Sequence, residues 1–274
     1  MKIDQPYLLI DFDDEKIIFF VIKFDKELNS EIICSYIINS KGIIKGRITD
    51  IDIASEIIKK NLNLIENKIN FIFKDVTILI NPDNIKCINI SGYKKLSGAK
   101  VLKEDVTYIL NEIKELVSEN EPKYSLIHLF NSNFFIDKNN LRNIPLGLYG
   151  DFYNQDMSFF SVEKNNLKNF KLTLNNSNVN VDRVILKPFV EGINMLSKAK
   201  LDSNIAIVKI GKNRSNVSLF KNQAFIYSEN FNFGTNLIIK DLAKLCSISF
   251  DIATNILTNL SFVEIKQDNY SEHL

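Results

Sequence analysis

The sequence is poor in several features that would mark a particular class of protein. Its 274 residues include no tryptophan and nine glycines, and the formal net charge is +1. A charge this close to zero gives no overall attraction to nucleic acid or anionic lipid, so we expect no nucleic-acid partner. No apolar run approaches the roughly 18 residues of a membrane span, and the start shows no signal-peptide pattern. We therefore expect a cytoplasmic protein.

Cysteine is also scarce. Cys34, Cys87 and Cys246 are widely spaced and form no CxxC pair. This spacing argues against a disulfide framework and against a zinc site, and favours three buried thiols in a reducing compartment. No metal ligand set is predicted. The 45% hydrophobic and 24% charged residues are those of a globular chain with a real core.

The first 80 residues predict a β-β-β-α-β order. Apolar runs at 7–12, 16–23 and 31–39 read as a three-strand meander. A helix with Asp52 as its N-cap follows, and residues 71–80 read as a buried strand. This order is typical of a ribonuclease-H-like beginning, with the last strand parallel to the first.

The remaining chain predicts an insertion and then a second meander. Residues 81–162 read as a small unit with a hairpin around Gly92 and Gly98, a helix over 104–118, and long strands after it. Further elements are expected as a helix or irregular segment at 165–176, a strand at 181–187, a helix begun by Pro188, strands at 203–211, 216–222 and 224–230, and helices at 235–245 and 249–260.

The stretch "IDFDDEKI" places Asp11, Asp13, Asp14 and Glu15 in one short turn. One interpretation is a phosphatase of the haloacid-dehalogenase type, with Asp11 as nucleophile and Asp13 as acid/base on Mg²⁺. That family needs a helix and cap after the turn, whereas this chain continues with the strand-like "KIIFFVI".

Two weaker signals are read as structural. His128 lies in a strand pattern and finds no catalytic partners. The glycine turn with Lys41, Lys45 and Arg47 is interpreted as a solvated basic turn, with a phosphate contact as the alternative.

An ordered series of short motifs resembles the bacterial cell-division protein FtsA. The series consists of "KGIIKGRITDID", "VLKEDVTYIL", "IHLFNSNFFIDKNNLRNIPLGLYGD" and "FGTNLIIKDLA". The resemblance implies an actin-like α/β fold of two subdomains with an inserted small α+β subdomain and an incomplete second half. The ranges expected are 1–80 and 163–200 for the first subdomain, 81–162 for the insertion, and 201–274 for part of the second. The insertion is expected to bind other proteins through a loop with Asn143, Pro145, Gly147 and Gly150.

The nucleotide loops depart from the family pattern. Where the family reads D-I-G-T-S-K, this chain keeps Asp11 and Lys16 but places Asp13, Asp14 and Glu15 between them. The second loop loses both of its acids. The vestigial cleft is predicted from these residues together with Lys209, Gly211, Lys212, Arg214, Ser215 and Gly234. We expect no enzyme activity, and weak or lost binding of ATP and Mg²⁺. The acids of the first turn pair with the bases of the second, or both stay solvated.

The resemblance also implies partners. They are the tubulin-like FtsZ and other division proteins, at the cytoplasmic face of the inner membrane at the division site. The chain's end shows no amphipathic anchor, so membrane contact is expected through a partner, and exposed apolar surface predicts self-association. A pilus- or secretion-type actin homologue is the alternative.

Overall fold

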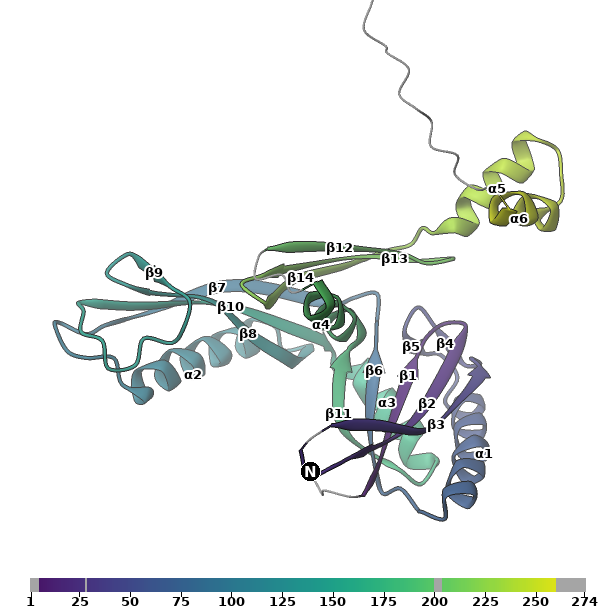
Figure 1. Cartoon of the computed structure of the whole chain (residues 1–274), viewed down its shortest axis with the longest axis horizontal. Coiled ribbons are helices and arrows are strands. Elements are labelled where there is room, and N and C mark those ends of the chain that lie inside the picture. Colours follow the sequence, from purple (N-terminus) through teal and green to yellow (C-terminus); the bar gives the residue numbers. More distant parts are fainter. Residues whose placement is uncertain (1–4, 28, 200–203, 260–274) are drawn as a thin grey trace, which may run out of the picture. The chain divides into compact units, whose positions relative to one another are not determined.

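The computed structural model describes residues 5–27, 29–199 and 204–259 (Figure 1). They belong to two compact units: Met1–Val208 with Asn216–Asn230, and Lys209–Ser215 with Phe231–Leu274. The four subdomain ranges expected from the sequence remain predictions.

The first unit is built on a five-stranded sheet in the order β11-β6-β1-β2-β3. Strands β1, β2 and β3 form an antiparallel meander, and β6 and β11 run parallel to β1. The predicted meander and returning parallel strand are therefore confirmed. The strands are β1 (Pro6–Phe12), β2 (Lys16–Phe24), β3 (Ser30–Asn39), β6 (Asp75–Ile80) and β11 (Asn180–Leu186).

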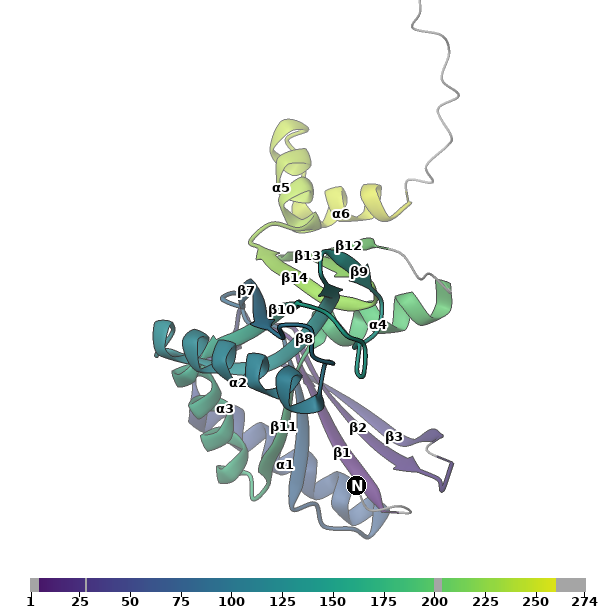
Figure 2. The ribbon, with the colours of Figure 1, turned by 90° about the vertical axis from the view of Figure 1, so that its left-hand side faces the viewer.

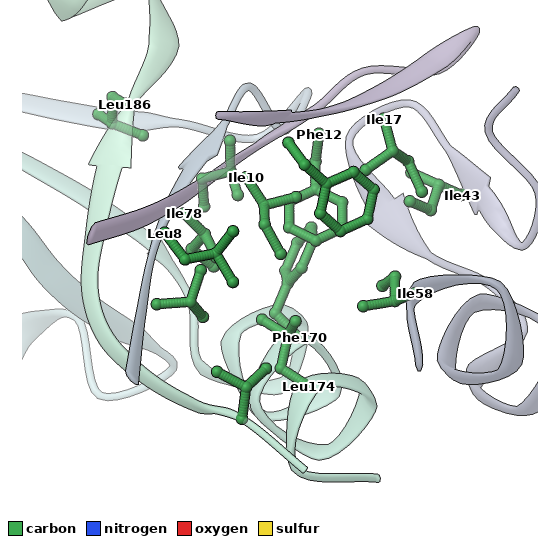
Figure 3. Packing of buried hydrophobic residues seen from close by; sticks show 14 of the residues in the cluster. Leu8, Ile10, Phe12, Ile17, Ile43, Ile58, Ile78, Phe170, Leu174 and Leu186 are labelled. Atoms are coloured by element: carbon green, nitrogen blue, oxygen red, sulfur yellow. The ribbon is translucent and has the colours of Figure 1, made fainter. Parts of the chain in front are cut away.

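The core of this unit lies on one face of the sheet. Alternate residues Leu8, Ile10 and Phe12 of β1 point to the same side, toward Phe170 (Figure 3). The rings of Phe12 and Phe170 meet edge to face at 5.0 Å. Each fully buried side chain of this size contributes roughly 1.5–3 kcal/mol, so the alternation fixes which face the helices cover. Those helices are α1 (Ile51–Ile69) and α3 (Lys164–Asn176). The short strands β4 (Ile43–Ile44) and β5 (Arg47–Ile48) lie between β3 and α1 in the chain.

The inserted part has its own antiparallel sheet, in the order β7-β10-β8-β9. Its strands are β7 (Lys86–Lys95), β8 (Tyr124–Ile136), β9 (Asn139–Leu141) and β10 (Phe152–Glu163), and α2 (Lys103–Asn120) lies along one face (Figures 1 and 2). The predicted hairpin around Gly92 is wrong, because residue 92 is in the middle of β7. A Cβ at Gly92 would lie 2.3 Å from Cγ2 of Ile109, so this glycine lets α2 approach the sheet.

A second meander follows, as predicted. Strands β12 (Ile205–Ile210), β13 (Ser215–Lys221) and β14 (Ala224–Phe231) form a three-stranded sheet. The hairpin of β13 and β14 packs within the first unit, where the ring of Phe225 stacks on Phe160 at 4.2 Å. Helix α4 (Lys187–Ala199) lies between β11 and this meander in the chain. The second unit contains α5 (Thr235–Leu245) and α6 (Phe250–Asn259); residue 260 of the predicted last helix lies outside the described residues.

Two local predictions are corrected. Asp50, and not Asp52, caps α1, because its carboxylate accepts from the Ile53 N–H at 2.9 Å. The three cysteines are free thiols, but Cys246 is exposed, so the expectation of three buried thiols is wrong.

Candidate functional site

The candidate site lies where three parallel strands of the first unit end. Strands β1, β6 and β11 are parallel, so their carboxyl ends share one edge of the sheet. Asp11 lies at the end of β1, and residues 11–16 form what we call the acidic turn before β2. Lys187 follows β11 directly as the first residue of α4. The edge at the carboxyl ends of parallel strands is where ligands of open α/β sheets usually bind.

Lys187 joins the two carboxylates of this edge. Its Nζ lies 2.9 Å from Oδ2 of Asp11 and 2.9 Å from Oδ2 of Asp13. The side chains of Lys187 and Asp11 are 12% and 10% exposed, whereas that of Asp13 is 44% exposed. The ion pair with Asp11 is therefore largely withdrawn from water, where charge-assisted hydrogen bonds are strongest.

The charges of the site shift one another's proton affinity. Burial raises the pKa of the Asp11 carboxyl above its ordinary value, against the opposing effect of the Lys187 ammonium. Burial alone would lower the pKa of Lys187, but Asp11 and Asp13 outweigh it and raise that pKa. Lys187 is thus a firmly held cation at neutral pH.

Two backbone N–H groups of the acidic turn, those of Asp13 and Asp14, are bonded within the turn. Asp14 N donates to Oδ1 of Asp13 at 2.8 Å, and Asp13 N donates to the Lys16 carbonyl at 3.0 Å. The Gly46 N–H donates to Oδ1 of Asp14 at 2.8 Å, which ties the turn to the β4–β5 connection. Phosphate-binding loops instead aim unbonded N–H groups at the ligand. Here a lysine ammonium lies on Asp11, and two of the turn's N–H groups are already bonded.

The remaining predicted residues of the first unit lie at the surface or in ion pairs. Glu15 and Lys16 are exposed. Lys45 lies 4.0 Å from Asp83, and Arg47 lies 3.3 Å from Glu163, so the glycine turn is part of the packing around the site.

The second predicted loop closes on the start of α5 within the second unit. Thr235 N donates to the Gly211 carbonyl and Asn236 N to the Lys212 carbonyl, both at 2.9 Å. A Cβ at Gly234 would lie 2.3 Å from the Gly211 oxygen, so this close contact requires glycine. The first N–H groups of a helix are an anion site when unbonded, but here the loop's own carbonyls take two of them.

Other predicted residues of that loop have defined places. Ser215 Oγ donates to the Phe233 carbonyl at 2.8 Å, and Lys209 lies exposed on β12. Lys212 is exposed and Arg214 is half-buried. The predicted pairing of these bases with the acidic turn concerns two separate units and stays a prediction.

His128 connects the inserted sheet to the candidate site. Its Nε2 accepts the Leu186 N–H at 3.0 Å, one residue before Lys187. Burial lowers the pKa of His128 to about 4, so the ring is neutral and can accept this bond. This hydrogen bond joins β8 to the end of β11, which is a structural role of the kind predicted for His128.

A second candidate surface is the loop of residues 142–151, which we call the tip loop. Gly147 N donates to the Val101 carbonyl and Val101 N to the Leu148 carbonyl, both at 2.9 Å, and Pro145 is buried. Gly150 exchanges backbone bonds with residues 98 and 99. These bonds hold the loop against residues 98–101, while Leu146 and Tyr149 are 53% and 72% exposed. Asn143 is exposed in the same loop.

Lys187 was missed by sequence reasoning. Its local context, at the last residue of the strand predicted for 181–187 and directly before Pro188, is a signal that could have found it. Among the described residues, no three His, Cys, Asp or Glu side chains gather as a metal site. No described helix combines the length and apolar character that a bilayer crossing requires.

Comparisons with known proteins agree with this architecture. No established protein-family profile matches the chain. The FtsA cell-division proteins of Buchnera aphidicola subsp. Acyrthosiphon pisum and of Neisseria meningitidis are 22% and 21% identical over 217 residues, 79% of this chain. The match covers 51% and 52% of their lengths, so the chain spans about half the length of these curated relatives. Among solved structures, a PilM–PilN type IV pilus biogenesis complex matches with a TM-score of 0.63 at 9% identity, over 93% of this chain and 70% of that one.

The strand order and this structural likeness define the class as a mixed α/β protein of the actin-like ATPase fold. Within that class, the chain is a distant homologue of the cell-division protein FtsA over 79% of its length.

Proposed function

We propose that the chain is an FtsA-like division protein that acts through protein–protein contacts and has lost Mg-ATP chemistry. The observation that carries this proposal is the acidic turn, where Lys187 holds both Asp11 and Asp13 and the N–H groups of Asp13 and Asp14 are bonded within the turn. These two donors are not available to a phosphate.

Electrostatics favour the same conclusion. Two like charges 4 Å apart repel by about 1 kcal/mol in water and about 4 kcal/mol at an effective dielectric near 20. Lys187 neutralises part of the charge of Asp11 and Asp13, but Asp14 and Glu15 remain in the turn. A polyphosphate at this edge would therefore meet net repulsion.

We place the phosphatase alternative second because of the strand that follows the turn. The turn leads directly into β2, which pairs antiparallel with β1, whereas that family needs a helix and cap. We propose no enzymatic activity.

The partners proposed are FtsZ and other division proteins, at the cytoplasmic face of the inner membrane at the division site. The tip loop is the proposed contact surface, because exposed apolar side chains that lie close together are a feature of protein interfaces. Membrane attachment comes through a partner, and self-association is expected. The pilus-assembly alternative rests on a likeness of fold alone, while the sequence relatives are division proteins.

Titration with ATP and Mg²⁺ tests the proposal. The intact chain is placed in a calorimeter and titrated with Mg-ATP to millimolar concentration, and we expect no saturable heat. A full-length FtsA relative, titrated side by side, shows that the assay detects binding. Micromolar affinity of this chain would contradict the loss of the nucleotide site.

A further inference from the structure

We infer that the ammonium of Lys187 is the resident cation of the acidic turn and replaces a metal ion there. This inference rests on the proposed function and concerns the regulation of the same site. It means that the turn is held in one closed state by the chain itself, whatever the supply of metal or nucleotide.

The contacts of Lys187 are those of a bridging cation. One ammonium lies 2.9 Å from an oxygen of each of two carboxylates that come from the same turn. The second oxygen of Asp13 is occupied by the Asp14 N–H. The lysine and the backbone thus fix both carboxylates in converging positions, which is the arrangement that a hard divalent cation also needs.

The site retains unused capacity for a cation. Oδ1 of Asp11 is buried and has no hydrogen-bond partner, in a residue that is 7% exposed. Two carboxylates against one ammonium also leave a formal charge of −1. Without the lysine, Oδ2 of Asp11 and Oδ2 of Asp13 would both lose their cation, and carboxylate oxygens are the preferred ligands of Mg²⁺ and Mn²⁺.

Covalent attachment explains why the lysine prevails over a dissolved ion. Lys187 is fixed in sequence directly after Leu186, whose N–H is held by His128. Because Lys187 follows β11 in the chain, its ammonium does not have to bind from solution. Its effective concentration at the carboxylates is set by the fold. A metal ion would have to displace it and leave a buried ammonium unpaired.

The test removes the ammonium and measures cation binding. Lys187→Met keeps a long apolar side chain but removes the charge. We expect the variant to bind one Mn²⁺ at least tenfold more tightly than the wild type in calorimetry or electron paramagnetic resonance. We also expect Mn²⁺ to raise its unfolding temperature. Lys187→Arg, which keeps the charge, should resemble the wild type.

A second variant shows where the ion binds. Asp13→Asn in the Lys187→Met background should remove the gained Mn²⁺ affinity, whereas Glu15→Gln in that background should retain it. If Lys187→Met is unfolded in buffer, refolding by millimolar Mn²⁺ supports the inference, and failure to refold counts against it.

Two results would overturn the inference. One is a wild type that binds Mn²⁺ as tightly as Lys187→Met; the other is a folded Lys187→Met protein with no gained affinity. Neither result affects the proposed function, which fails separately if the wild type binds Mg-ATP. Failure of the inference and failure of the proposal are therefore distinguished.

Discussion

The acidic turn and the tip loop are both fixed by internal hydrogen bonds, yet they differ in what they present to solvent. The acidic turn withdraws its key charge, since Asp11 and Lys187 pair below the surface. The tip loop uses backbone bonds to residues 98–101 to keep Leu146 and Tyr149 exposed. A carboxylate that already holds a lysine ammonium is less open to a further ligand, whereas an exposed apolar loop gains free energy when a partner covers it. The proposed function therefore depends on the exposed tip loop more than on the acidic turn.

The largest effect on this difference between the two loops is expected from removing the cation of the acidic turn. Lys187→Met should lower the free energy of unfolding by about 3 kcal/mol, because it leaves a buried carboxylate without its cation. Urea unfolding at neutral pH, followed by circular dichroism, measures the loss. The loss should shrink on acidification, since the pKa of Asp11 is raised by burial and protonation removes the charge.

A matched variant separates charge from packing in that experiment. Asp11→Asn combined with Lys187→Met removes both partners, and the loss should be smaller than for Lys187→Met alone. A loss equal in the single and double variants would show that Lys187 contributes through its methylenes and not through its charge.

A smaller effect should follow from His128, which connects the inserted sheet to the residue before Lys187. Its pKa is about 4 in the folded protein and about 6.5 when unfolded, so the unfolded state binds the proton first as pH falls. Stability should be complete above pH 6.5 and fall by about 1–2 kcal/mol toward pH 4, a figure reduced for partial exposure.

The control for this prediction is His128→Gln, whose side-chain oxygen can accept the Leu186 N–H without titrating. Urea midpoints of the two proteins, compared across this pH range, isolate His128 from Asp11, which titrates in the opposite sense. Parallel pH profiles for wild type and variant would rule out the proposed contribution of His128.

The sequence predicted the secondary-structure elements better than it predicted side-chain contacts between distant positions. The meander of β1 to β3, helix α2 and the second meander were predictable, because apolar alternation and helical spacing are local signals. Gly92 was misread because a glycine that admits a helix looks the same in sequence as a glycine in a turn. Asp11 and Asp13 were found from their own turn, whereas Lys187 lies 174 positions from Asp13 and only the parallel pairing of β1, β6 and β11 brings it there.

The smallest change in stability, and the sharpest test of surface function, comes from the tip loop. Tyr149→Ser should alter the free energy of unfolding by no more than about 0.5 kcal/mol, because the side chain is 72% exposed. Ile72→Ser is the matched control, since Ile72 is 76% exposed and lies outside the inserted subdomain. Binding to FtsZ from the same organism, measured by co-sedimentation, should weaken about tenfold for Tyr149→Ser and stay unchanged for Ile72→Ser. Equal binding by both variants would remove the tip loop from the contact surface, because a side chain that anchors a partner and one that merely faces solvent cannot respond alike.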